Sequence, residues 1–166
     1  MKNYRFILLS LLLLIVQVFI CNYFGLSRLV LVSLLPAILL MLPQEYGGVV
    51  TMLIAFAAGF AVDFFSTGML GLTSAALVPA ALLRRPVIAM VFGDELSSRN
   101  DQVSLSHLGV PKMTLAMLIL CSVFLLVYVW IDSAGTSGFW TGALRFALSV
   151  LVSTPLCVFV AAILRP

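Results

Sequence analysis

The sequence consists of long apolar runs, each close to the length of a membrane-spanning helix, separated by charges, prolines and glycine clusters. A helix needs about 20 mainly apolar residues to cross the hydrocarbon core of a bilayer. Of the 166 residues, 63% are apolar and only 9% are charged, whereas soluble domains are about 25% charged. A fold of this size has too little interior to hide so many large apolar side chains from water. The sequence therefore predicts an all-α integral membrane protein whose surface is largely covered by membrane lipid.

Dividing the chain at these interruptions predicts a six-helix bundle that forms one transmembrane domain, residues 1–166. The predicted spans are about residues 5–24, 27–42, 47–65, 69–83, 111–131 and 139–164, with a loop over residues 84–110. The second and fourth spans are short, because about 16 residues make roughly 24 Å of helix against a core about 30 Å thick. Short spans occur around a cavity or where the bilayer is thinned, and length alone leaves both alternatives open.

The distribution of Lys and Arg predicts the orientation of the chain. With the N-terminus inside, the cytoplasmic segments carry seven of the nine basic residues, the outer loops carry only Arg28, and Arg145 falls inside the sixth span. Short cytoplasmic loops are enriched in Lys and Arg. Both termini and the loop 84–110 are therefore expected in the cytoplasm. The first part of that loop, residues 86–92, is apolar and is expected to form an interfacial helix that continues the fourth span.

Asp63 is the most unusual polar residue of the spans, because an ionised group at membrane depth usually faces the protein interior, water or a partner charge. Gly59 and Ala55 precede it at helical spacing, which predicts a face that another helix can approach closely. Arg145 is predicted at a similar depth in the sixth span, so an ion pair between Arg145 and Asp63 is one hypothesis. The alternative is that Asp63 caps a helix or reaches the outer headgroups.

Other residues interrupt the spans in ways that predict local structure. Gln17 is expected to hydrogen-bond across helices, and Gly71 offers a small surface where the third and fourth spans form an antiparallel hairpin. Pro43 ends the second span, while Pro36 and Pro155 are expected to bend the second and sixth spans.

The sequence shows no constellation typical of catalysis or cofactor binding. It has no glycine-rich phosphate loop and no metal-ligand cluster, and its single histidine, His107, has no companion ligand. Cys21, Cys121 and Cys157 lack the spacing of a disulfide framework or metal site. The basic residues form no stripe suited to nucleic acid. We therefore expect a protein that is not an enzyme, with no cofactor and no catalytic or metal site.

Several residues together resemble the MreD family of rod shape-determining membrane proteins. The resemblance covers most of the chain and rests on Leu42-Pro43-Gln44, Gly47, Gly59, Asp63 and Leu70-Gly71, supported by the prolines of the second and sixth spans. Its most specific part is the pattern Gly-x3-Asp-x6-Leu-Gly, which runs from Gly59 to Gly71. The loop 84–110 and Arg145 have no counterpart in the family pattern.

The resemblance implies a non-enzymatic scaffold of the bacterial cell-elongation machinery in the inner membrane. It implies MreC as the direct partner, and MreB and the peptidoglycan glycosyltransferase-transpeptidase pair as indirect partners in the control of cell shape. The family is also similar in fold to the S components of energy-coupling-factor transporters, whose six helices enclose a ligand cavity. By that analogy Gly59, Asp63, Gly71 and Arg145 would line or support an outward-facing pocket. The alternative function is therefore a small-molecule-binding subunit of a transporter.

Overall fold

The computed structural model describes residues 2–23, 31–42, 46–66, 69–93, 110–133 and 139–163, and every regular element in these ranges is an α-helix. The helices are α1 (Lys2–Tyr23), α2 (Leu35–Met41), α3 (Gly48–Phe65), α4 (Leu72–Phe92), α7 (Val110–Ser133) and α8 (Phe139–Ile163). By length and composition, α3, α4, α7 and α8 can each cross a membrane, and α1 contains a shorter apolar stretch. The predicted class, an all-α membrane protein, is confirmed at this level, and the count of six spans stays a prediction.

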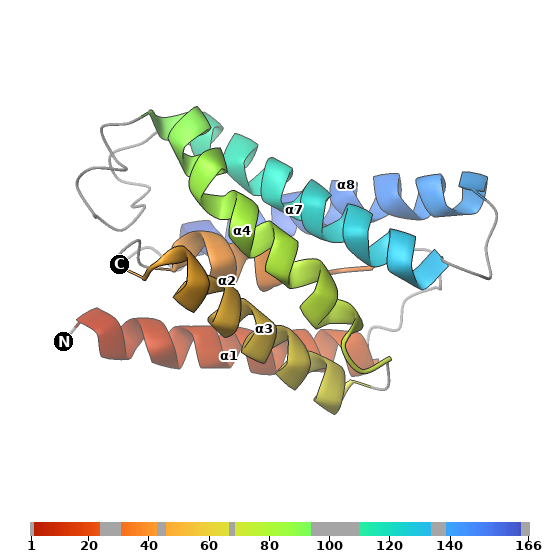
Figure 1. Ribbon diagram of the computed structural model, residues 1–166, viewed down its shortest axis with the longest axis horizontal. Coiled ribbons are helices and arrows are strands. Elements are labelled where there is room, and N and C mark those ends of the chain that lie inside the picture. Colours follow the sequence, from red (N-terminus) through yellow and green to blue (C-terminus); the bar gives the residue numbers. More distant parts are fainter. Residues whose placement is uncertain are drawn as a thin grey trace.

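The longer helices form a bundle around α2 (Figure 1). Helices α3, α4, α7 and α8 pack against one another in chain order, and α1 lies against α3. The short helix α2 contacts each of the other five described helices. The start of α1 and the end of α8 lie at the same end of the bundle (Figure 1). Which side of a membrane that end faces stays a prediction.

The prediction of one continuous helix over residues 27–42 is wrong for the described part of that span. Residues 31–34 are not helical, and α2 covers only seven residues. Pro36 lies in the first turn of α2, where backbone N–H groups have no acceptor within the helix, so the N–H that proline lacks is not missed. Pro36 therefore stands at the start of a short helix, and the expected bend within a longer helix is absent. Pro155 lies within α8, which remains helical on both sides of it.

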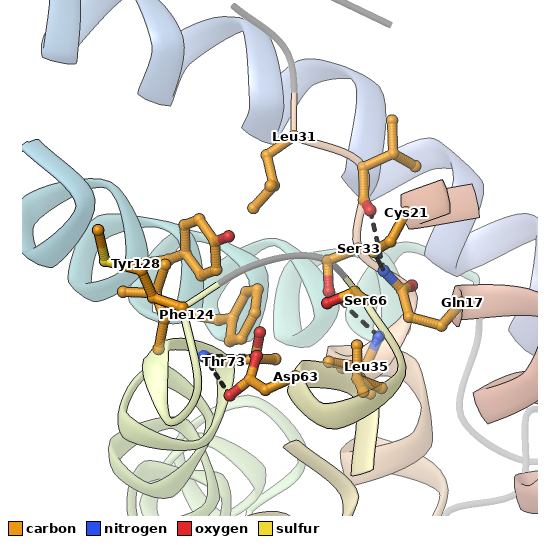
Figure 2. Close-up of a pocket in the computed structure, with 14 residues that line it drawn as sticks. Gln17, Cys21, Leu31, Ser33, Leu35, Asp63, Ser66, Thr73, Phe124 and Tyr128 are labelled. Atoms are coloured by element: carbon orange, nitrogen blue, oxygen red, sulfur yellow. Dashed lines mark hydrogen bonds between the residues drawn. The ribbon is translucent and has the colours of Figure 1, made fainter. Parts of the chain in front are cut away.

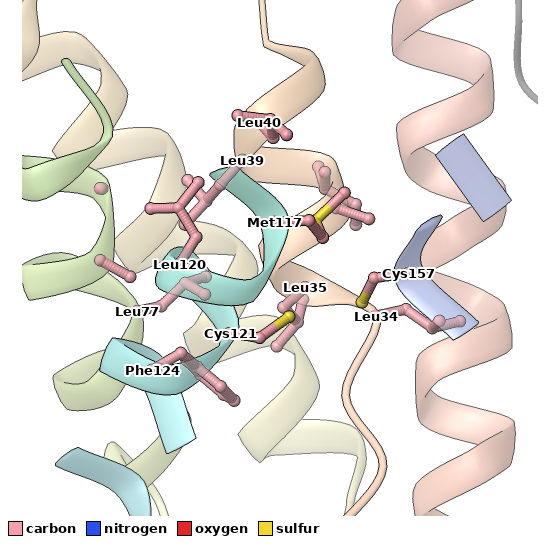
Figure 3. Packing of buried hydrophobic residues seen from close by; sticks show 14 of the residues in the cluster. Leu34, Leu35, Leu39, Leu40, Leu77, Met117, Leu120, Cys121, Phe124 and Cys157 are labelled. Atoms are coloured by element: carbon pink, nitrogen blue, oxygen red, sulfur yellow. The ribbon is translucent and has the colours of Figure 1, made fainter. Parts of the chain in front are cut away.

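Helix α2 is buried on all sides, and its leucines form the centre of the core (Figure 3). They pack against apolar side chains of α4, α7 and α8, among them Leu77, Met117, Leu120, Cys121, Phe124 and Cys157. Because lipid is as apolar as leucine, such a core gains its stability from close packing more than from exclusion of water. Residues 33–40, which belong to the second predicted span, are thus enclosed by the neighbouring helices.

The antiparallel hairpin predicted for the third and fourth spans is confirmed, because α3 and α4 pack side by side (Figure 1). Ala55 and Gly59 lie buried on the face of α3 that meets α4. A Cβ atom built on Gly59 would lie only 2.7 Å from the Cα atom of Ser74 in α4. The predicted close approach along this face is therefore confirmed.

The helix of the fourth predicted span does not stop at Arg84. Helix α4 continues through Arg84, Arg85 and Pro86 to Phe92, and the apolar stretch Leu72–Val91 has 20 residues. Residues 84–92 of the predicted loop are therefore helical, and the expected helix over residues 86–92 that continues the fourth span is present. At the other end of the predicted loop, Val110 is the first residue of α7. Helix α4 is long and apolar enough to cross a bilayer, so its length gives no argument for a cavity.

Candidate functional site

The predicted ion pair between Asp63 and Arg145 is wrong, because each side chain has another partner. Arg145 Nη1 lies 3.0 Å from Asp132 Oδ2, and both side chains are partly exposed. Asp63 Oδ2 accepts hydrogen bonds from the backbone N–H groups of Gly71 and Thr73, both at 3.0 Å. The first N–H groups of a helix have no partner within the helix, and a carboxylate stabilises that end. The alternative role of Asp63, as a helix cap, is confirmed.

The Asp63 cap joins the end of α3 to the beginning of α4. The Asp63 side chain is only 3% exposed, and Ser74 N is a third backbone donor to Oδ2 at 3.3 Å. Gly71 precedes the first residue of α4 with φ at +94°, a left-handed conformation that glycine adopts without strain. Four positions before Asp63, Gly59 lets the backbone of α4 come close. The spacing Gly-x3-Asp-x6-Leu-Gly thus builds one tight helix-to-helix joint.

The non-helical residues 31–34 present a backbone that lipid cannot satisfy, and Gln17 of α1 supplies part of the missing hydrogen bonds. Gln17 Nε2 donates to the carbonyl oxygen of Val32 at 3.1 Å, and Gln17 Oε1 accepts from Leu34 N at 2.7 Å. Irregular backbone at membrane depth is stable only where the protein provides such partners. Gln17 is 2% exposed and does hydrogen-bond between segments, as predicted, although its backbone partners precede a helix.

Helix α8 supplies further partners of this backbone. Ser149 Oγ accepts from Leu31 N at 2.9 Å, and Ser153 Oγ accepts from Ser33 N at 3.3 Å and donates to the carbonyl oxygen of Leu31 at 3.1 Å. Cys157 Sγ donates to the carbonyl oxygen of Ser33 at 3.2 Å. The sequence analysis assigned no role to these two serines. Their signal is the spacing of four residues, which puts all three α8 side chains on one helix face.

Replacing Gln17 with leucine is expected to lower the free energy of unfolding by about 1–2 kcal/mol, because it leaves two buried backbone groups without a partner. Reversible unfolding by SDS in mixed micelles, followed by circular dichroism, measures this change. Val16→Leu, at an exposed position of the same helix, is the matched control and should change stability by less than about 0.5 kcal/mol. Equal stability of the Gln17 and Val16 variants would contradict the assigned role.

Arg84 is a buried charge that the sequence analysis counted among the cytoplasmic basic residues. Its side chain is 2% exposed, and Nη2 donates to the carbonyl oxygens of Leu40 and Leu42 at the end of α2. A positive charge stabilises the carboxyl end of a helix. Within the described residues, Arg84 Nε has no hydrogen-bond partner. Arg84 therefore holds the buried end of α2 against α4.

A small cavity lies between the end of α1, the segment 31–34, the α3–α4 joint and α7 (Figure 2). Of the predicted residues, Gln17 and Asp63 line it. Among the others, Gly59, Gly71, Arg145 and Pro155 lie outside its lining, and Pro43 lies outside the described residues. Its volume is about 40 Å³, whereas pockets for small organic ligands have about 300–1,000 Å³. The cavity is therefore too small for a ligand of that kind.

The geometry of this region is that of a structural joint beside a small cavity. In the described ranges, no group of three or more His, Cys, Asp or Glu side chains is placed to hold a metal ion. The buried polar side chains of Gln17 and Asp63 bond to backbone groups. Comparison of the chain with protein-family models, with curated protein sequences and with solved structures finds no match.

Proposed function

We propose that this chain is a non-enzymatic membrane scaffold of the bacterial cell-elongation machinery in the inner membrane, as its resemblance to the MreD family implies. The observation that carries the proposal is that Gly59, Asp63 and Gly71, which belong to the most specific pattern of the resemblance, together form the joint between α3 and α4. Asp63 gives its carboxylate to backbone N–H groups, and Gly59 gives space to α4. Charge-assisted hydrogen bonds of this kind stabilise the folded structure. The residues of the pattern therefore have a structural role, which suits a protein without catalytic activity.

A scaffold needs a surface for its partner, and one face of α8 has suitable properties. Exposed large apolar side chains follow one another along it at spacings of four, four and three residues up to Leu151, and Phe159 lies eight residues further: Trp140, Leu144, Leu148, Leu151 and Phe159. The opposite face carries the buried Ser149, Ser153 and Cys157. None of residues 140–148 is buried in the bundle. A stripe with this spacing suits a second helix that packs along α8.

We assign this stripe to the membrane-spanning helix of a single-span partner, which the family resemblance identifies as MreC. The assembled pair would then connect the MreB filament to the peptidoglycan glycosyltransferase-transpeptidase pair. Helix α8 is long and apolar enough to cross a membrane, so a partner helix packed along it would lie in the apolar region of the membrane over much of its length.

Cysteine crosslinking in membranes tests this assignment. Leu144→Cys and Leu151→Cys should each crosslink to a cysteine in the membrane-spanning helix of coexpressed MreC. Leu126→Cys is the matched control, because Leu126 is an exposed leucine on α7, away from the stripe. Equal crosslinking from all three positions, or from none, would contradict the assignment of the α8 stripe.

Depletion of the protein in a rod-shaped bacterium tests the function itself. We expect cells to lose rod growth and MreC to copurify with the tagged protein. Normal rod growth together with absence of MreC from the purified complex would contradict the scaffold. A small organic molecule retained through purification would instead support the transporter-subunit alternative.

A further inference from the structure

Two adjacent arginines of α4 have no acidic partner in the described part of the chain. Arg84 is 2% exposed, and its Nε is the only buried side-chain nitrogen or oxygen in that part without a hydrogen-bond partner. Its charged neighbour is Arg85, which is exposed. The only carboxylates of the described residues are Asp63, which caps α4 at its other end, and Asp132, which pairs with an arginine. The described residues therefore leave two positive charges without a counter-charge.

The two guanidinium groups lie at the end of α2 and at the start of α3. Arg84 Nη2 donates to the carbonyl oxygen of Leu42, and Arg85 Nη2 donates to the carbonyl oxygen of Tyr46 at 3.4 Å. Carbonyl oxygens carry only partial negative charges, so these bonds position the guanidinium groups without neutralising them. A charge held away from water normally has a partner of opposite sign. An anion beside these arginines would supply it.

The amino end of α3 lies beside Arg85 and borders open space. Gly59 of α3 meets Ser74 of α4 in the antiparallel hairpin, so Gly48, eleven residues before Gly59, is level with Arg85, eleven residues after Ser74. The first N–H groups of a helix have no acceptor within it, and Gly47 gives α3 no side-chain cap. A Cβ atom built on Gly47 or Gly48 would meet nothing within 4 Å. A group from outside can therefore approach these N–H groups.

This arrangement has the chemistry of a phosphate site. The amino end of a helix offers backbone N–H donors and about half a positive charge. The forked N–H groups of an arginine match two oxygens of a phosphate, and Arg85 is exposed next to the start of α3. Arg84 adds a second positive charge one residue away. A cation would be repelled by all three features.

The level of the site in the bundle indicates a membrane lipid as the source of the phosphate. Helix α3 can cross a membrane by length and composition, and its 18 residues span about 27 Å, close to the thickness of the hydrocarbon core, about 30 Å. With α3 across the bilayer, its amino end lies near the phosphates of one leaflet. The start of α7, which carries the exposed Lys112, lies beside the end of α4 (Figure 1). This end of the bundle is therefore basic over several helices.

Basic pockets between membrane helices bind the headgroups of anionic lipids. A zwitterionic headgroup carries its own cation, which two arginines repel. We propose that the amino end of α3 and Arg85 bind the phosphate group of an anionic phospholipid, with Arg84 as the buried second charge. Such a lipid would join the start of α3 to α4 at the end of the hairpin opposite the Asp63 cap. The site is independent of the scaffold function, so either proposal can fail without the other.

Thermal unfolding of the protein in dodecyl maltoside micelles tests the site. Mixtures of phosphatidylglycerol and phosphatidylcholine are added at fixed total lipid and constant ionic strength. We expect phosphatidylglycerol to raise Tm saturably, by about 3–6 °C once it exceeds its Kd about tenfold. Arg85→Gln removes an exposed charge and one long hydrogen bond. It should keep the Tm measured in phosphatidylcholine and raise the phosphatidylglycerol midpoint at least about fivefold.

A second variant fills the site from within the chain. Gly47→Asp puts a carboxylate at the N-cap of α3, where aspartate is favourable and a Cβ atom has space. This carboxylate takes the place of the phosphate, so Tm in phosphatidylcholine should rise and the response to phosphatidylglycerol should disappear. Lys112→Gln is the matched control, because it removes an exposed positive charge from α7, which packs against α4 and α8. It should keep the midpoint of the unmodified protein.

The proposal is overturned if phosphatidylglycerol and phosphatidylcholine give the same Tm, because another part of the chain would then supply the counter-charge. It is also overturned if Arg85→Gln keeps the original midpoint, or if Lys112→Gln shifts the midpoint as much as Arg85→Gln does. Sodium phosphate, exchanged for sodium chloride at constant ionic strength in lipid-free micelles, should give no saturable rise. A rise equal to that with phosphatidylglycerol would overturn the lipid as the source of the phosphate.

Discussion

Replacing Asp63 with alanine is expected to lower the free energy of unfolding by about 3–5 kcal/mol, because buried donors lose a charged acceptor and stay unpaired. The N–H groups of Thr73 and Ser74, which are buried, and that of Gly71, which is partly buried, would lose this acceptor. Asp63→Asn keeps one acceptor oxygen and should cost less. The measurement is reversible unfolding by SDS in mixed micelles.

Asp63 and Asp132 allow the effect of a helix cap to be compared with that of an ion pair, because Asp63 caps α4 and Asp132 pairs with an arginine. Asp132 pairs with Arg145, with 30% and 24% of their side chains exposed, so Asp132→Ala should cost less than about 1 kcal/mol. Arg145→Ala should have a similarly small effect. If Arg145→Ala destabilised the protein as much as Asp63→Ala, the capping role of Asp63 would be contradicted.

The face of α3 that packs on α4 could be predicted from the sequence, but the partner of Asp63 could not. Ala55, Gly59 and Asp63 recur at helical spacing, and the helical period alone puts them on one face. The donors to Asp63, however, are backbone N–H groups, which every residue except proline possesses. Only side chains are distinguishable in a sequence, so Arg145 was the apparent partner.

The second predicted span shows a different limit of the sequence. An apolar run indicates that residues 27–42 lie in the membrane, but it does not require that they are helical. Residues 31–34 can stay non-helical because Gln17, 15 residues earlier than Val32, and Ser149, 118 residues after Leu31, pair with their backbone. Partners at such separations follow from the packing of α1 and α8, which the local sequence does not encode.

Two arginines normally mark the edge of a membrane helix, and for that reason the fourth span was predicted to end before Arg84. Arg84 instead lies inside the bundle, where the carboxyl end of α2 receives its guanidinium group. That acceptor exists only because α2 ends inside the protein. The end of α2 inside the protein and the burial of Arg84 in α4 are therefore parts of one arrangement.

Replacing Gly59 with alanine is expected to lower the free energy of unfolding by about 2–3 kcal/mol, the second largest effect, because the new methyl group has no space. Its carbon would lie 2.7 Å from Ser74 Cα and 2.8 Å from Ser74 N. These are backbone atoms, which cannot turn aside as a flexible side chain can. Helices α3 and α4 would have to separate, and Asp63 would be drawn away from the N–H groups that it caps.

Gly48→Ala is the matched control, since a Cβ atom there meets nothing within 4 Å at the exposed start of the same helix. It should be neutral or slightly stabilising, because alanine favours a helix over glycine by up to about 1 kcal/mol. SDS unfolding of the Gly59→Ala and Asp63→Ala variants and of the double variant then tests their coupling. Because the separation of α3 and α4 already weakens the cap, the double variant should lose less stability than the sum of the two single losses. Additive losses would mean that Gly59 and Asp63 act independently, contrary to the single joint that their spacing builds.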